Sequence, residues 1–332
     1  MDTDAFAAAH QNEWRRLEKL AHQRRLTGAE VDELTGLYRA SAAHLSRVRT
    51  QAPDPALISR LSTTLGEARS RLAPQRGLGP EAVARFFVIT LPASFYRVRW
   101  WTVIVGVVFV LIAIAAGWWF TQSPAVRADI GTPADFERYA NEAFEAYYSN
   151  YPAPDFAAQV WTNNAWISFQ AIGAGLTGFW PAYLLWSNAV AVGQAGGIMA
   201  MYGDLSVFFG LILPHGLMEL TAVFVAIGAG LKIFWTWLVP GPRTRVRALR
   251  EEGTRLITVA LGLIVVLAIS GGVEAFVTPS EFLPTWAKIT IGALVLAAYW
   301  AYTLILGRRA VRQGELGDLP EEQGGYVVLE SA

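Results

Sequence analysis

A long and almost uncharged segment constrains the fold of this chain more than any other feature. Between residues 161 and 239 the charged side chains are only those of Asp204, Glu219 and Lys232. Soluble domains keep about a quarter of their residues charged, so this stretch is not typical of a domain in water. Inside a bilayer, helices and closed barrels alone satisfy the backbone polar groups. The segment therefore predicts several membrane-spanning helices in an all-α, polytopic bundle.

Six spans are predicted along the chain. The first is residues 100–120, which are uncharged, carry tryptophans at both ends and are long enough to cross a hydrocarbon core of about 30 Å. The other five are expected at residues 163–186, 188–213, 214–239, 255–277 and 285–307. With six spans, the arginines before the first span, after the fourth and after the last share one side of the membrane. Positive residues concentrate in cytoplasmic loops, so both termini are expected in the cytoplasm.

One connection in this map lacks a polar turn between two full spans. Gly203-Asp204 is the natural break, and it would leave the third span short and a half-helix at 205–212 before Pro214. Broken helices are common in transporters and must pack against protein. A poorly packed connection would give the same sequence pattern.

The first 99 residues differ in composition and predict a cytoplasmic helical domain. They carry 15 basic and 10 acidic side chains. Thr27 and Glu30 form a capping box that starts a helix, and residues 81–99 predict an interfacial amphipathic helix. The remaining predicted segments are an extracytoplasmic segment with an amphipathic helix at 121–160 and a cytoplasmic tail at 308–332.

A set of polar and helix-shaping residues lies within or beside the predicted spans. His215 and Glu219 are four residues apart, so they share one helix face, and Pro214 suits a first helical turn. The six-span topology places Glu274 at a similar depth. The complete candidate set is Asn163, Asn164, Asn188, Asp204, Pro214, His215, Gly216, Glu219 and Glu274. Ionisable groups in a bilayer are costly, so this polar intramembrane cluster is the candidate site, functional or structural.

Two interpretations of the cluster stay open. Buried polar side chains frequently hold membrane helices together, each contributing about 0.6 to 2 kcal/mol. The same groups could line an ion or substrate pathway. A metal would find only two ligands in His215 and Glu219, and catalytic zinc takes three. Gly193 and Gly197 form a GxxxG motif, which predicts close helix packing.

The sequence also argues against several function classes. It has no cysteine, which removes disulfides and thiolate sites. It has no Walker A, HExxH or GxSxG motif. The N-terminal arginines alternate with acids, so nucleic-acid binding is not expected. We predict no catalytic residue, cofactor or metal; the expected partners are the lipid bilayer and membrane or envelope proteins, and homo-oligomerisation is left open.

Four motifs stand out in the second half of the chain. They are Asn163-Asn164 before a glycine-rich span, Asn188 before a span of small residues, Pro214-His215-Gly216 with Glu219, and Glu274-Ala275-Phe276 before Thr278-Pro279. Together they resemble the stage II sporulation protein M (SpoIIM) family of bacterial membrane proteins. The resemblance covers about residues 160–280 and departs at Ala189, where the family pattern has glycine. It implies a multi-pass protein of the bacterial cytoplasmic membrane, similar to membrane anchors for peptidoglycan-degrading partners, and it establishes no catalytic activity.

Three function classes follow from these observations. We favour a non-enzymatic scaffold or anchor for envelope or peptidoglycan-associated partners. The first alternative is a transporter or channel with a polar pathway through His215, Glu219 and Glu274. The second is an intramembrane metal-assisted hydrolase, which would need a further ligand beside His215 and Glu219.

Overall fold

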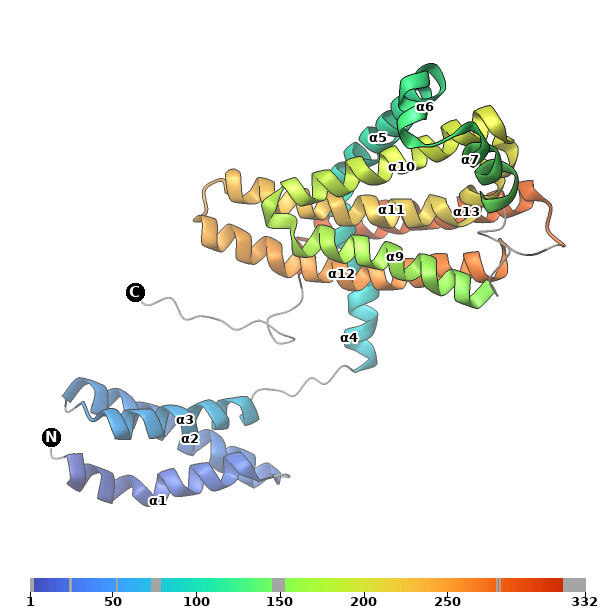
Figure 1. The fold of residues 1–332 in the computed structure, drawn as a ribbon. Helices are drawn as coiled ribbons and strands as arrows, with labels where there is room; N and C mark the ends of the chain where they lie inside the picture. Colours follow the sequence, from blue (N-terminus) through green and yellow to red (C-terminus); the bar gives the residue numbers. More distant parts are fainter. Residues whose placement is uncertain are drawn as a thin grey trace. The chain divides into compact units, whose positions relative to one another are not determined.

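The chain is helical in two compact units, Met1–Gly79 and Pro80–Ala332 (Figure 1). The computed structural model describes residues 3–23, 26–51, 53–72, 79–144, 153–278, 280 and 282–318, and all regular secondary structure among them is helical. The predicted all-α class is confirmed.

The N-terminal unit consists of α1 (Thr3–His22), α2 (Gly28–Gln51) and α3 (Pro55–Leu72). Their buried apolar faces meet in one core, which contains Trp14, Leu17, Leu20, Leu34, Leu45, Leu61, Leu65 and Ala68. The predicted capping box is present, because the Glu30 carboxylate accepts a hydrogen bond from the Thr27 backbone N–H at 2.8 Å. A start signal in the sequence therefore fixes where α2 begins.

The second unit begins earlier than predicted, at Pro80 instead of residue 100. The predicted interfacial helix at 81–99 is instead the first part of one helical element that continues to Gln122. Leu91 and Phe95 are buried and pack on Gly262, so this segment belongs to the core of the second unit.

The described elements of the second unit are α4 (Pro80–Arg85), the π-helical η1 (Phe86–Thr90), α5 (Leu91–Gln122), α6 (Pro124–Ile130), α7 (Pro133–Arg138), η2 (Tyr139–Ala143), α9 (Ala153–Gly173), η3 (Gly175–Thr177), α10 (Phe179–Tyr202), α11 (Leu205–Leu238), α12 (Arg245–Phe276), α13 (Thr285–Ala301), η4 (Tyr302–Gly307) and α14 (Arg308–Arg312).

Among the described residues, five helical elements are long and apolar enough to cross a membrane, where the sequence predicted six spans. They are Pro80–Gln122, Phe179–Tyr202, Leu205–Leu238, Arg245–Phe276 and Thr285–Arg312. The predicted span at 163–186 is wrong, because the chain turns between α9 and α10. Gly178 stands at the turn with a φ of +64°, a conformation that glycine adopts without strain. The sequence from Ala171 to Gly178 has no charged residue, so the hydropathy of the segment does not reveal the turn.

The predicted break at Gly203-Asp204 is present, since α10 ends at Tyr202 and α11 begins at Leu205. The predicted short third span and the separate half-helix at 205–212 are wrong. α10 begins at Phe179, so it has 24 residues, and α11 runs unbroken through Pro214. A membrane helix tolerates an internal proline where neighbouring helices pack against it. α13 is such a neighbour, because its Gly292 packs against the Pro214 carbonyl.

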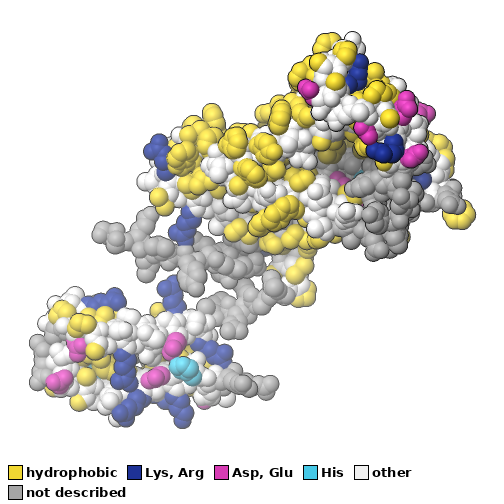
Figure 2. All heavy atoms as spheres, viewed as in Figure 1, with side chains coloured by type: hydrophobic (Ala, Val, Ile, Leu, Met, Phe, Trp, Pro, Cys, Tyr) yellow, Lys and Arg dark blue, Asp and Glu magenta, His cyan; other side chains and the backbone are white. Residues whose placement is uncertain are grey.

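Large apolar side chains cover the outside of the second unit. Figure 2 shows them over the visible face, and the exposed ones on α5, α9 and α10 include Leu111, Trp118, Phe169, Phe179 and Trp186. A soluble monomer rarely exposes apolar patches of this extent. Acyl chains are their matching environment, so the surface agrees with a multi-pass membrane protein.

Candidate functional site

The predicted pair on α11 lies inside the helix bundle. His215 and Glu219 are 5% and 3% exposed, and they share the helix face that their spacing predicts. Glu274, near the end of α12, is 1% exposed, and its Oε1 lies 3.8 Å from His215 Nε2. Three ionisable side chains from two neighbouring helices therefore occur in the protein interior and avoid lipid.

Neighbouring helices supply further polar contacts to this group. From α9, the Asn164 amide donates a hydrogen bond to Glu219 Oε2 at 2.8 Å. From α12, the Ser270 hydroxyl donates to the His215 carbonyl oxygen at 3.1 Å. Just after α12, Thr278 Oγ1 lies 3.3 Å from His215 Nδ1. The contacts join α9, α11 and α12, which lie side by side in Figure 1. We call Asn164, His215, Glu219, Ser270, Glu274 and Thr278 the polar cluster.

Sequence reasoning missed Ser270 and Thr278, although a signal was present. Both residues stand four positions from Glu274, one on each side. Ser270 shares its helix face, and Thr278 follows one turn later, just past the end of α12. Once Glu274 was a candidate, these two hydroxyl-bearing neighbours were candidates as well.

The other predicted residues do not join the polar cluster. Asn163 is exposed, and the Asn188 amide donates to the Leu184 carbonyl of its own helix at 2.8 Å. Asp204 is exposed and caps α11 by accepting from the Ser206 backbone N–H at 2.7 Å, a bond that lowers the pKa of this carboxyl. Pro214 and Gly216 are buried beside the cluster on α11 and shape the helix without adding a polar side chain.

Some cluster oxygens have no hydrogen-bond partner among the described residues. They are Glu219 Oε1 and both carboxyl oxygens of Glu274, all buried. A buried acceptor without a donor costs about 1 to 3 kcal/mol, more when it is charged. The 3.8 Å contact between His215 and Glu274 is an ion pair only when the imidazole is protonated.

A second buried ionic group joins α11 to α12 elsewhere along their length, 13 residues from Glu219 on α11. Lys232 Nζ lies 2.5 Å from Glu252 Oε1, and Arg255 Nη1 lies 3.2 Å from Glu252 Oε2. Sequence reasoning did not find this group, since Glu252 and Arg255 stand among many charged residues after Val239. It ties the two helices together at a second level.

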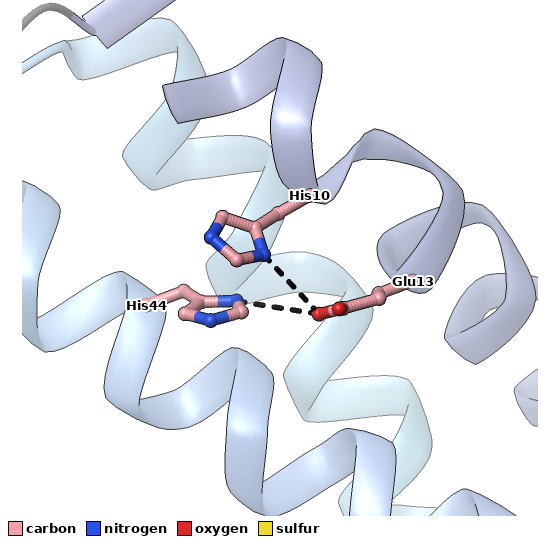
Figure 3. A group of neighbouring side chains, drawn as sticks. All are labelled: His10, Glu13 and His44. Carbon is pink, nitrogen blue, oxygen red and sulfur yellow. Dashed lines mark ion pairs between the residues drawn. The ribbon is translucent and has the colours of Figure 1, made fainter. Parts of the chain in front are cut away.

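A third group lies in the N-terminal unit, where α1 and α2 face each other. Figure 3 shows His10, Glu13 and His44 converging, with Glu13 Oε2 at 3.4 Å from His10 Nδ1 and 3.9 Å from His44 Nδ1. Burial, and then the charge of His10, lower the pKa of His44. The spacing of His10 and Glu13 on one helix face was visible in the sequence, but the approach of His44 from another helix was not.

Two family models match this chain. One, the stage II sporulation protein M, matches residues 106–279, and the other, a domain of unknown function (DUF8413), matches residues 4–74. No curated protein and no solved structure matches. The first match covers more than half of the 332 residues and contains the whole polar cluster. The chain therefore belongs to the stage II sporulation protein M (SpoIIM) family.

Proposed function

We propose that this multi-pass membrane protein is a non-enzymatic scaffold or anchor for envelope or peptidoglycan-associated partners. The observation that carries the proposal is the enclosed polar cluster. Its ionisable members are at most 5% exposed, and its hydrogen bonds join α9 to α11 and α12 to α11. Polar groups used in this way hold helices together.

Close backbone packing supports the same role. A Cβ added to Gly193 on α10 would overlap the Ala113 carbonyl on α5, and one added to Gly230 on α11 would overlap the Ala171 carbonyl on α9. Helices at this separation have no room for side chains to rearrange between them. A rigid bundle suits an anchor, whereas alternating access needs two packings of the same helices.

The family resemblance and the charge distribution support placement in the bacterial cytoplasmic membrane with both termini in the cytoplasm. α9 is the sixth crossing in this proposal, although it is less apolar than the others. Asn164 contacts Glu219 and Ala171 packs on Gly230, so α9 and α11 run in the same direction. Six crossings place the arginines after α11 and in α14 on one side, in agreement with the positive-inside rule.

Photo-crosslinking in native membranes tests the anchor role. A photoreactive residue is placed at exposed positions of the N-terminal unit and of α6, and a matched set is placed at lipid-facing positions of α5. We expect one reproducible membrane or envelope protein to crosslink from the first set and not from the second. Products that are the same for both sets would contradict the proposal.

A second candidate function is a proton or cation pathway. It is favoured by Glu219 Oε1 and both carboxyl oxygens of Glu274, to which no described residue donates a hydrogen bond. Such oxygens can accept a proton or a cation. The purified protein in liposomes, loaded with a pH dye or a cation dye, separates the two functions. A scaffold gives no flux, either in the wild type or in Glu219→Gln. Flux that Glu219→Gln abolishes in a folded protein would favour the pathway.

The hydrolase alternative gains no support from the donor geometry. Among the described residues, three or more His, Asp or Glu donor atoms converge within 4.8 Å at His10, Glu13 and His44, not around His215.

A further inference from the structure

We propose that His10, Glu13 and His44, where α1 meets α2, bind a divalent transition-metal ion such as Zn²⁺. Their donor atoms all lie within 4.8 Å of one another. This site is separate from the polar cluster, because its residues belong to the other compact unit. It would give the N-terminal unit a metal-dependent state.

The separations fit a tetrahedral ion after small side-chain movements. Zinc bonds of about 2.0 to 2.1 Å imply about 3.3 Å between neighbouring ligand atoms. The carboxylate oxygen of Glu13 lies 3.4 Å from His10 Nδ1 and 3.9 Å from His44 Nδ1. The first separation already matches, and the second exceeds the ideal by less than about 1 Å.

The surrounding residues fix the imidazole rings in place. The two ring centroids are 3.9 Å apart, and the Phe6 ring packs at 4.6 Å from His10 and 5.5 Å from His44. The buried indole of Trp14 donates to His44 Nδ1 at 3.3 Å, a long bond that an ion at this nitrogen would replace. His10 Nδ1 is buried and makes no hydrogen bond with any described residue. A buried ring nitrogen without a hydrogen bond is a group that a metal would satisfy.

The donor set selects the class of ion. Two imidazoles and one carboxylate suit zinc, copper and nickel, whereas calcium and magnesium prefer sets made of oxygen alone. Glu13 is 45% exposed, so an ion has an entry path from solvent and a fourth position open to water. Because the ligands come from α1 and α2, a bound ion would also cross-link these helices.

The chain offers a matched control. His22 lies in the same unit, at 3.6 Å from Glu67 Oε2, and its side chain is 62% exposed. It is a histidine–glutamate pair without a second histidine nearby among the described residues. Four histidines occur in the chain, and no cysteine competes for the ion.

The test is calorimetric titration of the full chain, purified without a histidine tag in detergent, with Zn²⁺ and separately with Mg²⁺. We expect one Zn²⁺ per chain, no heat from Mg²⁺, and Zn²⁺ affinity at least tenfold weaker in His10→Ala and in His44→Ala. His22→Ala should bind as the wild type does. Glu13→Gln, at an exposed position that leaves the fold intact, should also weaken binding.

The absorption spectrum of bound Co²⁺ gives a second measurement. A site with imidazole ligands and low coordination number gives intense visible bands, which we expect to disappear in His44→Ala and to persist in His22→Ala. The proposal is overturned if the wild type takes up no Zn²⁺. It is also overturned if Glu13→Gln and both ligand-histidine variants bind as tightly as the wild type, or if His22→Ala loses as much affinity as His44→Ala.

Discussion

Replacing Gly193 by alanine tests whether backbone contact between α5 and α10 stabilises the bundle. A Cβ at this position would overlap the carbonyl oxygen of Ala113 and stand 3.0 Å from its Cα. The contact is reciprocal, because a Cβ on Gly117 would stand 2.8 Å from the Gly193 carbonyl oxygen. All these partner atoms belong to the backbone, so no rotamer change relieves the overlap. The two helices must separate by about 1.3 Å to bring the Cβ and the Ala113 carbonyl oxygen to normal contact near 3.5 Å.

The expected loss in the free energy of unfolding follows from the contacts that this separation removes. A gap of about 0.5 to 1 Å already forfeits about a quarter to a half of the van der Waals attraction across a contact, and this separation is larger. Between helices in lipid, packing is a main attraction, because acyl chains are as apolar as the side chains. Overpacking costs about 1 to 3 kcal/mol, and alanine regains up to about 1 kcal/mol of helix propensity over glycine. We expect Gly193→Ala to lower the free energy of unfolding by about 2 kcal/mol, or about 30-fold in the equilibrium constant.

Gly196→Ala is the matched control on the same helix. Its Cβ would stand 3.5 Å from the Phe208 ring, an ordinary contact. Both variants are unfolded in mixed micelles by increasing the dodecyl sulfate fraction, with tryptophan fluorescence as the signal. The control should equal the wild type or exceed it by up to about 1 kcal/mol, from helix propensity. If Gly193→Ala is as stable as Gly196→Ala, backbone contact between these helices does not stabilise the bundle.

Three further predictions use the same preparation. Asn164→Ala leaves Glu219 Oε2 buried without its donor, so the free energy of unfolding should fall by about 1 to 3 kcal/mol; an unchanged value would mean that the bond does not tie α9 to α11. Gly178→Ala puts a residue with a side chain at a backbone φ of +64° and presses its Cβ against α11, so we expect the free energy of unfolding to fall by about 1 to 3 kcal/mol. Wild-type stability of this variant would contradict the prediction. The backbone N–H of Thr27 lowers the pKa of Glu30 from its ordinary 4.5. The capping box therefore stabilises α2 fully above pH 4.5, and this stabilisation is lost as the pH falls through the lower pKa of the folded state. Amide exchange in the first turn of α2, corrected for intrinsic rates, should therefore accelerate in acid in the wild type, and the same acceleration in Glu30→Ala would refute this.

The sequence predicted that His215, Glu219 and Glu274 lie close together, but it did not predict the direction in which each polar side chain points. Spacing placed His215 and Glu219 on one face, and the topology placed Glu274 near them, as the structure shows. Asn188 was also a candidate, yet its amide bonds its own helix. In water, an apolar stripe reveals which face of a helix is buried. In a bilayer both faces of a helix are apolar, so the sequence has no periodicity that shows which face is turned toward the protein interior.

Span boundaries failed for a related reason. A turn in water needs polar residues, but the turn between α9 and α10 is made by glycines packed against α11. Pro214 was expected at the start of a helix because proline suits a first turn. α13 packs against its carbonyl through Gly292, and α11 continues. Tertiary contacts that hydropathy does not encode decided both cases.

Glycine positions carry the rotational information that hydropathy lacks. On α11, Gly230 packs against Ala171 of α9, and Glu219 accepts from Asn164 of the same helix. The two α11 residues are 11 positions apart, which at about 100° per residue is three turns and about 20°, so they share one face. Their partners on α9 are seven positions apart, about 20° short of two turns, and they share a face too. The glycine that lets α9 approach α11 therefore also marks the side on which the buried carboxylate finds its amide, and a sequence search that aligns glycines with polar residues at helical spacing would have directed Glu219 toward the protein interior.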